Sequence, residues 1–348
     1  MSPQKDYLKS EILSMKSDLL TEEYLSIKRK NENFAYIVCI LTQFVWAIQG
    51  LQLKTYHIWF PKTYKINSFI FWRNIGVVSL GYIMCKYKKI EITKPNKIKN
   101  KLWFYIRNVG IYICIVTWMK ALSIFRLSSC QIVGGMNPLL TIIMSIFILG
   151  DKFYIRYLYG IIICFSGSSI IILNERNPES TNEINHNGNI SIGILSLIIN
   201  VSLFSLGNVG QKKLCNEKLS PEEQTYYFGV YSLLIGFFFS FFSFDFGISN
   251  FFYCVYSISN GIVFYLCNYF TSVAFKYIEI SKLMPVTYLN VVIIFFLGSF
   301  LFHEKIFFSD VIGASMIIGF IVYNGMYPPK SKVASNNVDN NNNSNNDN

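Results

Sequence analysis

Ten long apolar runs, separated by short polar or basic loops, restrict what this chain can fold into. Hydrophobic residues make up 52% of the sequence and charged residues only 15%. Each run approaches the roughly 20 residues that a helix needs to cross the hydrocarbon core of a bilayer. Backbone polar groups there must be satisfied within the segment, so the sequence predicts an all-α membrane protein with ten transmembrane helices. The expected spans are 34–53, 66–85, 102–121, 129–149, 155–174, 190–210, 225–244, 252–274, 281–302 and 308–327.

An internal repeat relates the two halves of the chain. The stretch 121–160 recurs 153 positions later without a gap, so that Asn137 falls on Asn290 and Asp151 falls on Glu304. A shared element of this length at one spacing indicates that one unit was duplicated. Chance alignment of two segments rich in Ile and Phe is the alternative. A shared acid–Lys pair, followed by Gly at the same offset, argues against chance.

The repeat and the polar segments divide the chain into five parts. We expect a cytosolic N-terminal segment at 1–32, a first five-helix repeat at 34–174, a polar linker at 175–188, a second five-helix repeat at 189–327 and a disordered Asn-rich cytosolic tail at 328–348. Apolar residues lie at helical spacing in the N-terminal segment. This segment therefore forms either an amphipathic helix on the membrane surface, or a short cytosolic helix or disordered tail. The Asn-rich tail cannot bury a core.

Lys and Arg residues set the expected orientation. The net charge of +11 invites a nucleic-acid partner, but the lysines lie in loops, with seven of them in 86–101. They are better explained as topology signals and partners for lipid headgroups, so no nucleic acid is expected. The positive-inside rule then places both termini in the cytosol. Because each half has five spans, the second half enters the membrane in the opposite orientation, as in many secondary transporters.

Each half carries a set of residues that together form a recognisable pattern. They are Ala121-Leu122, Pro138, Asp151 and Gly160 in the first half, and Ala274, Tyr288-Leu289, Glu304 and Gly313 in the second. The pattern is an alanine–leucine pair, a mid-helix proline, an acid at the helix end and a glycine that opens the next helix. It resembles the EamA-like ten-span branch of the drug/metabolite transporter superfamily. Two departures are Asp in place of Glu at 151 and the absence of a proline at Val291. The resemblance implies a carrier for a small organic metabolite.

Polar residues inside the spans are the candidates for substrate binding, because they are costly in a bilayer unless they face a cavity or each other. The predicted site residues are Gln43, Trp46, Arg73, Asn137, Asn200, Asn208, Asn268, Tyr288 and Asn290. Arg73 would pair with an anionic cargo; the alternative is a headgroup or helix-end carbonyls. Arg107, about one turn inside its span, is expected to snorkel toward the interface. The amides could also serve as interhelical contacts.

Glycine and proline positions indicate where helices bend and where they pack. Pro removes a helix hydrogen bond and Gly weakens a helix, so we expect hinges in spans four and nine. The predicted hinge residues are Gly134, Gly135, Pro138 and Pro285. Small residues in spans five and ten permit close packing, at Gly160, Gly167, Gly313 and Gly319. That packing lies within one chain or, as the resemblance implies, in a homodimer.

The remaining patterns limit the chemistry. Eight cysteines are scattered singly, without a Cys/His cluster, so neither a disulfide framework nor a metal site is expected, nor any cofactor. No Asp or Glu stands in mid-span, which favours exchange or facilitated diffusion over ion coupling. The competing hypotheses are an intramembrane enzyme acting on lipid or peptide, which needs a catalytic cluster, and a non-transporting membrane scaffold. The expected partners are a small-molecule substrate and the lipid bilayer of a membrane that the sequence leaves open.

Overall fold

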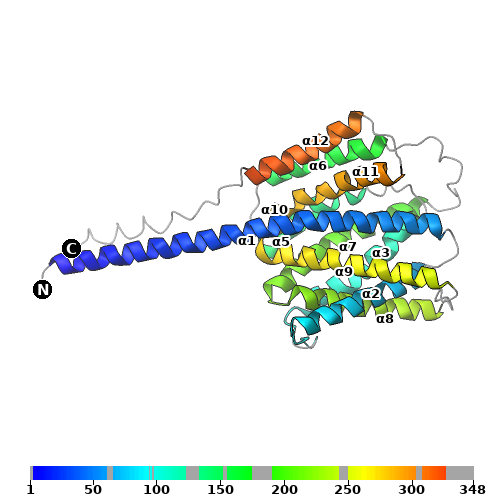
Figure 1. The fold of residues 1–348 in the computed structure, drawn as a ribbon, viewed down its shortest axis with the longest axis horizontal. Helices are drawn as coiled ribbons and strands as arrows, with labels where there is room; N and C mark the ends of the chain where they lie inside the picture. The colour runs from blue at the N-terminus through cyan, green and yellow to red at the C-terminus, as the bar shows by residue number, and fades with distance from the viewer. Residues whose placement is uncertain are drawn as a thin grey trace.

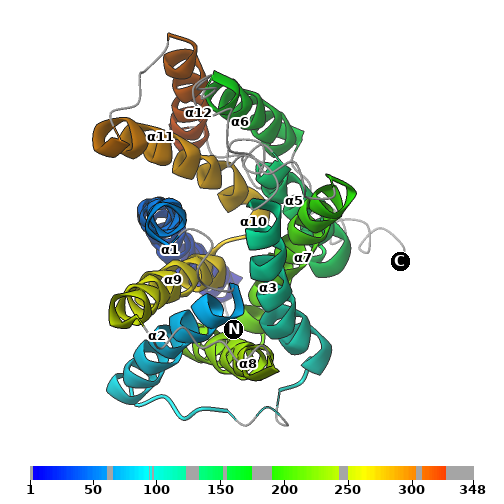
Figure 2. The same cartoon turned by 90° about the vertical axis from the view of Figure 1, so that its right-hand side faces the viewer.

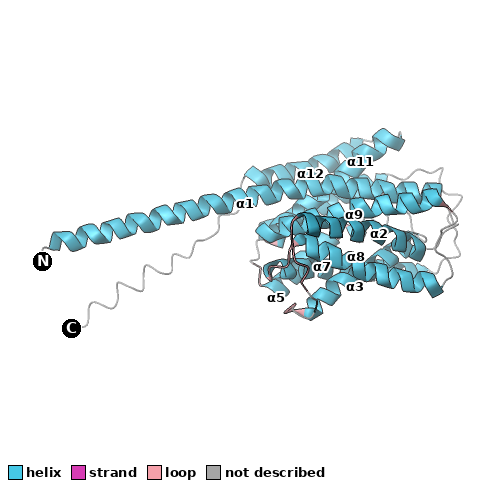
Figure 3. Cartoon of the chain, turned by 60° about the horizontal axis from the view of Figure 1, so that its bottom comes forward, coloured by secondary structure: helices cyan, strands magenta, loops and turns pink. Residues whose placement is uncertain are grey.

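The structure is a computed structural model that describes residues 3–60, 66–93, 95, 98–122, 133–151, 155–174, 190–242, 250–302 and 308–326. Within these ranges the chain consists of helices and connecting loops, without a strand (Figure 3). The elements are α1 (Pro3–Trp59), α2 (Ile66–Tyr87), α3 (Lys101–Leu122), α5 (Asn137–Leu149), α6 (Ile155–Asn174), α7 (Ile190–Asn216), α8 (Pro221–Phe242), α9 (Phe251–Tyr277), α10 (Ile280–Leu283), the 3₁₀ helix η3 (Met284–Tyr288), α11 (Leu289–Phe302) and α12 (Phe308–Met326).

Six helices of the described chain are long and apolar enough to cross a membrane, which makes this a multi-pass membrane protein. They are α2, α3, α7, α8 and α9, together with the Ser26–Leu53 part of α1. Shorter apolar helices occupy the other four predicted places, at Asn137–Leu149, Leu158–Gly167, Ile280–Ile294 and Val311–Tyr323. The sequence therefore located the apolar helices, whereas the number of spans stays a prediction.

The first helix is longer than its predicted span. Residues 3–59 form one helix, so the predicted N-terminal segment continues into the first span without a break. Its N-terminal part projects from the rest of the molecule (Figure 1). The apolar face predicted for the N-terminal segment falls on side chains outside the described set. The linker at 175–188 and the tail at 328–348 also lie outside the described residues.

The main helix pairs join the two halves of the chain, and exchanging the halves turns one pair into another. α3 packs along α7, and α9 packs along α1; α5 contacts α7, and α11 contacts α1. α2 packs against α8, and α6 packs against α12; in both pairs, each helix contacts the helix at the same place in the other half (Figure 2). When α1 to α6 are matched in order with α7 to α12, each of these contacts has its counterpart. The arrangement is that of two related halves enclosing a common centre.

Local sequence signals explain where several helices begin and end. The Ser220 hydroxyl accepts a hydrogen bond from the Glu223 amide at 3.2 Å, and Glu223 accepts one from the Ser220 amide at 3.0 Å. This capping box, with Pro221 at the first helical position, starts α8. Asn250 caps α9 through its side chain. Gly150 ends α5 in the left-handed region at φ 70°, where a residue without a Cβ is unstrained.

The helices α6 and α12 pack on each other through glycines. A Cβ at Gly160 would lie 1.8 Å from the Phe320 ring, and one at Gly167 would lie 2.7 Å from the Gly313 carbonyl oxygen. By contrast, a Cβ at Gly319 would meet nothing within 4 Å. Three of the four predicted packing glycines therefore take part in a contact within the chain. A homodimer through these helices stays a prediction.

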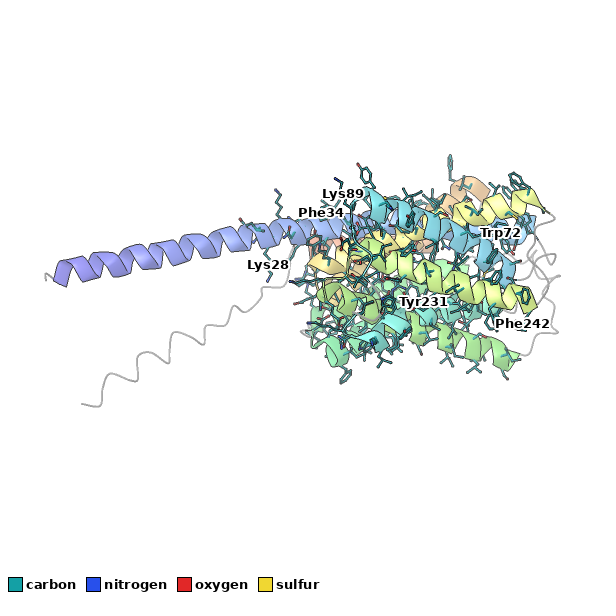
Figure 4. All side chains as sticks on the ribbon, turned by 90° about the horizontal axis from the view of Figure 1, so that it is seen from below. Lys28, Phe34, Trp72, Lys89, Tyr231 and Phe242 are labelled. Atoms are coloured by element: carbon teal, nitrogen blue, oxygen red, sulfur yellow. The ribbon has the colours of Figure 1, made fainter. Side chains whose placement is uncertain are left out.

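The two ends of the bundle differ in character. Lys28 and Lys89 lie at the end from which α1 projects, whereas Trp72 and Phe242 lie at the opposite end (Figure 4). The last described helix, α12, also ends at the α1 side (Figure 1). The arrangement agrees with the charge asymmetry from which the orientation was predicted. Which end faces the cytosol remains a prediction.

Candidate functional site

A cavity of ≈ 290 Å³ lies between the two halves. Its wall is formed by α1, α2, α3, α7, α9, η3, α11 and the start of α5. The nine predicted site residues all line it: Gln43, Trp46, Arg73, Asn137, Asn200, Asn208, Asn268, Tyr288 and Asn290. Ligand pockets start near 300 Å³, so the size suits a small metabolite. Polar residues scattered over both halves of the sequence thus converge on one space.

Two of the wall elements are interrupted helices. Spans four and nine were expected to bend at their glycines and prolines, and the structure interrupts both helices there. α5 begins only at Asn137, after a turn at Gly135 and Met136, and span nine is divided into α10, η3 and α11. The physical cause is Pro138 and Pro285, each of which lacks an amide hydrogen and obstructs the preceding turn. Gly134, Gly135 and Pro138 line the cavity, whereas Pro285 is buried behind it.

A hydrogen bond joins the two interruptions. The hydroxyl of Tyr288 donates to the backbone carbonyl of Gly135 at 2.5 Å. These positions are 153 residues apart, which is the spacing of the internal repeat. A carbonyl released by a broken helix needs a partner inside a membrane protein, and Tyr288 supplies it. The two broken helices therefore meet at related positions.

Arg73 is buried in the cavity wall with incomplete pairing. Its side chain is 1% exposed, and its guanidinium lies 4.4 Å from the centre of the Phe264 ring. Its Nε and Nη2 find no hydrogen-bond partner among the described residues. Its backbone is held by contact with α9, because a Cβ at Gly261 would lie 1.9 Å from the Arg73 carbonyl oxygen. The structure thus fixes a cation whose charge the ring only partly compensates.

Arg107 does not snorkel, contrary to our expectation. It is 2% exposed, and its Nη2 donates to the Asn268 side-chain oxygen at 2.7 Å. The guanidinium lies 5.5 Å from the centre of the Phe228 ring. The cause is packing: α3 lies along α7, where a Cβ at Gly210 would be 3.7 Å from the Arg107 Cβ. This face of α3 therefore turns into the bundle, and Nε and Nη1 remain without a partner in the described chain.

The cavity amides fall into two groups. Gln43 donates to the Cys39 carbonyl at 3.1 Å, and Asn200 donates to the Cys114 carbonyl at 2.7 Å. These amides are held by backbone, as interhelical or intrahelical contacts usually are. The side-chain oxygens of Asn137 and Asn290, which are related by the repeat, have no partner in the described structure. The second pair is therefore available to a bound molecule.

Aromatic rings form part of the apolar wall, beside aliphatic side chains. Trp46 contacts Phe204 and Phe264 edge-on, with ring centres 6.4 Å and 5.8 Å apart. Phe264 thus contacts both the Trp46 ring and the Arg73 guanidinium. Rings packed this way are rigid, so the polar groups around them keep their positions.

Sequence reasoning missed several lining residues. Gln211 donates to the backbone carbonyl of Asn268 at 3.2 Å, and Phe264 supports Arg73. Both could have been found, since Gln211 is three residues after Asn208 and Phe264 is four before Asn268, on the same helix faces. Asn260, which shares a helix with Asn268, instead donates to Gln52 at 3.1 Å.

The chemistry that the cavity offers is binding. In the described chain its wall holds guanidinium groups, amides, hydroxyls and rings, and no Asp, Glu or His. Searched over the same residues, the structure contains no group of three or more His, Cys, Asp or Glu side chains that could hold a metal ion. The arrangement can neutralise negative charge and orient a polar molecule.

Comparison with known proteins gives two matches. A sequence model of the EamA-like transporter family matches residues 33–173 and 191–326, which together make up most of the chain. A solved crystal structure superimposes with a TM-score of 0.68 over 85% of this chain and 98% of its own length. Its 13% sequence identity limits that likeness to the fold. No curated protein sequence matches the chain.

Proposed function

The chain belongs to the EamA-like transporter family, and on that premise we propose that it is a carrier that moves a small organic metabolite across a membrane. The observation that carries the proposal is the cavity between the halves, which collects the polar residues of otherwise apolar helices. Polar groups at membrane depth are costly and are kept where they serve a substrate path. A transporter of this architecture binds its substrate between its repeats.

Alternating access is the proposed mechanism. The ten predicted spans would form two inverted five-helix repeats, with both termini in the cytosol. The helix packing supports this proposal, because the contacts of α3 with α7 and of α5 with α7 have counterparts in those of α9 with α1 and of α11 with α1. The interrupted helices at Gly135 and at Met284–Tyr288 are the natural places for bending. The Tyr288–Gly135 hydrogen bond would break or re-form as the cavity changes sides.

An anionic cargo fits the wall best. Arg73 and Arg107 are buried without an acidic partner among the described residues, and a bound anion would neutralise them. Closing the cavity without cargo would leave these cations in a dry space at considerable cost. Return of the empty carrier should therefore be slow, and exchange of one cargo for another should be faster than net flow.

Counterflow in proteoliposomes tests this proposal. Vesicles are preloaded with single unlabelled metabolites of anionic, neutral or cationic type, and entry of the labelled compound is followed. We expect counterflow of anions that is lost in Arg73→Gln and kept in Arg156→Gln. Arg156 is the matched control, because it stacks on Tyr323 at 4.3 Å and does not line the cavity.

The outcomes separate the parts of the proposal. A folded protein that shows no counterflow with any class would reject the carrier function. Counterflow of neutral or cationic compounds that survives Arg73→Gln would keep the carrier function and remove Arg73 from the site. In that case the amides Asn137 and Asn290 would be the next residues to change.

A further inference from the structure

Two buried cations share one cavity. Arg73 and Arg107 both line it, and no Asp or Glu of the described chain does. The ion pairs found among these residues lie elsewhere, at Lys88–Glu222 and Lys282–Glu32. Arginine stays protonated in proteins, so the wall carries two positive charges that the described chain leaves uncompensated.

The free donors of both arginines lie at the edges of their guanidinium planes. The Cζ atom of Arg73 lies over the Phe264 ring at 4.4 Å from its centre, and that of Arg107 lies over the Phe228 ring at 5.5 Å. Nε and Nη2 of Arg73, and Nε and Nη1 of Arg107, have no partner among the described residues. In-plane donors of this kind match the paired oxygens of a carboxylate or phosphate. Nε and Nη2 of Arg73 share one edge and form an unused anion-binding edge, whereas Nε and Nη1 of Arg107 lie on different edges and offer two separate donors.

The two guanidinium groups belong to one binding region. The Phe264 and Phe228 rings, over which the arginines lie, have centres only 5.5 Å apart. Asn268 connects the same groups, because it accepts from Arg107 at 2.7 Å and donates to the Phe264 carbonyl at 2.9 Å. The supports of the two cations are thus in direct contact, and a small molecule in the cavity can engage both.

We propose that the cavity binds an organic dianion, whose two negative charges neutralise Arg73 and Arg107 together. A monoanion would leave one buried guanidinium without a counter-charge, which is costly in a low-dielectric site. The required chemistry is two negative charges on one small molecule, either on one phosphate ester group or on two carboxylates. The inference rests on the proposed carrier function and names its substrate class.

Thermal unfolding of the purified full chain in detergent tests binding without transport. Four probes are compared at neutral pH and equal ionic strength: methyl phosphate, succinate, propionate and neutral succinamide. We expect a saturable rise in Tm with methyl phosphate or succinate. Propionate should bind at least about tenfold more weakly, because it loses one charge-assisted contact, and succinamide should have no effect. The stronger of the two dianions shows whether the charges sit on one group or on two.

Charge-removing variants provide the second arm. Arg73→Gln and Arg107→Gln should each weaken dianion binding at least about tenfold, whereas Arg156→Gln should bind like the parent chain. Without ligand, each cavity variant should melt at or above the parent Tm, since an unpaired buried charge has been removed. Equal affinity for propionate and the dianions, or no stabilisation by any probe, would overturn the proposal even if a variant failed to fold.

Transport separates this inference from the proposed function. Dianion binding without counterflow would support the site and reject the carrier. Counterflow of a neutral compound, together with no dianion binding, would support the carrier and reject the dianion site.

Discussion

The two halves of this protein share a frame but contribute different chemistry to the cavity. The first half supplies the charge, through Arg73 on α2 and Arg107 on α3. Their counterparts by helix order are α8, which has no basic residue, and α9, which has only Lys276 in its last turn. The second half instead supplies the Phe264 ring and the amides that support the cations. A carrier needs two related halves to open in turn to each side, but it can recognise cargo with an asymmetric site.

The largest loss of stability is expected where α2, which carries Arg73, crosses α9 of the other half. Gly261→Ala would place a Cβ 1.9 Å from the Arg73 carbonyl oxygen, a backbone atom that cannot move away cheaply. We expect a loss of about 2 kcal/mol or more in unfolding free energy, measured by denaturation in detergent. Gly110→Ala is the control, because its Cβ meets nothing within 4 Å and should gain up to about 1 kcal/mol. Equal stability of the two variants would contradict this crossing.

The second-largest loss of stability is expected at Asn268, the amide that accepts a hydrogen bond from Arg107. Asn268→Ala removes the acceptor at 2.7 Å and leaves a further buried guanidinium nitrogen unpaired. Hydrogen bonds to charged groups contribute about 1.5–3 kcal/mol, so we expect a loss in that range. In the Arg107→Gln background, Asn268→Ala should lower the free energy of unfolding by less, and a double-mutant cycle measures the difference. Additive losses would show that the two halves are not coupled at this contact.

The bond between the broken helices should have a smaller effect on stability. Tyr288→Phe removes the donor to the Gly135 carbonyl, which should cost about 1 kcal/mol and change the counterflow rate more than cargo affinity. Tyr265→Phe is the matched control, because the Tyr265 hydroxyl is buried without a partner in the described chain. That control should be neutral or slightly stabilising. If both variants behave alike, the bond does not join the halves energetically.

A pH effect is expected at the end of the first broken helix, and it should be the smallest. Burial, followed by the charge of Glu279, raises the pKa of Asp151 above its usual value. The folded state then holds this proton more tightly than the unfolded state. Its stabilising contribution is full below the unfolded pKa of about 3.9, and it is lost as pH rises through the higher folded pKa. Asp151→Asn should flatten the decline of Tm with rising pH relative to the parent chain, measured by thermal unfolding in detergent.

The lining residues could be predicted because an amide or a guanidinium inside an apolar span must face a cavity or another polar group. That reasoning identified Asn137, Asn290 and Arg73 without any knowledge of the packing. It failed for Arg107, since distance from a helix end does not say which face the neighbouring helix covers. It also overlooked Phe264, because a single ring in a chain with 31 phenylalanines carries no signal until its neighbours are known.

The interruption of span nine was only partly predictable. Pro285 indicated a weak point, but a proline permits a kink, a 3₁₀ segment or a complete break. The choice depends on tertiary contacts, of which the Tyr288 hydrogen bond to Gly135 is one. Likewise, the duplication indicated two similar halves, whereas the division of charge between them follows from packing.

The central claim is that one cavity between the halves opens to each side of the membrane in turn. The direct measurement is labelling of a single cysteine at Thr287, which lines the cavity, in a chain whose native cysteines are replaced. A membrane-impermeant thiol reagent is applied to oriented proteoliposomes from one side and then from the other. We expect labelling from both sides, and bound cargo should slow it on each. Labelling from one side only, with or without cargo, would contradict the central claim.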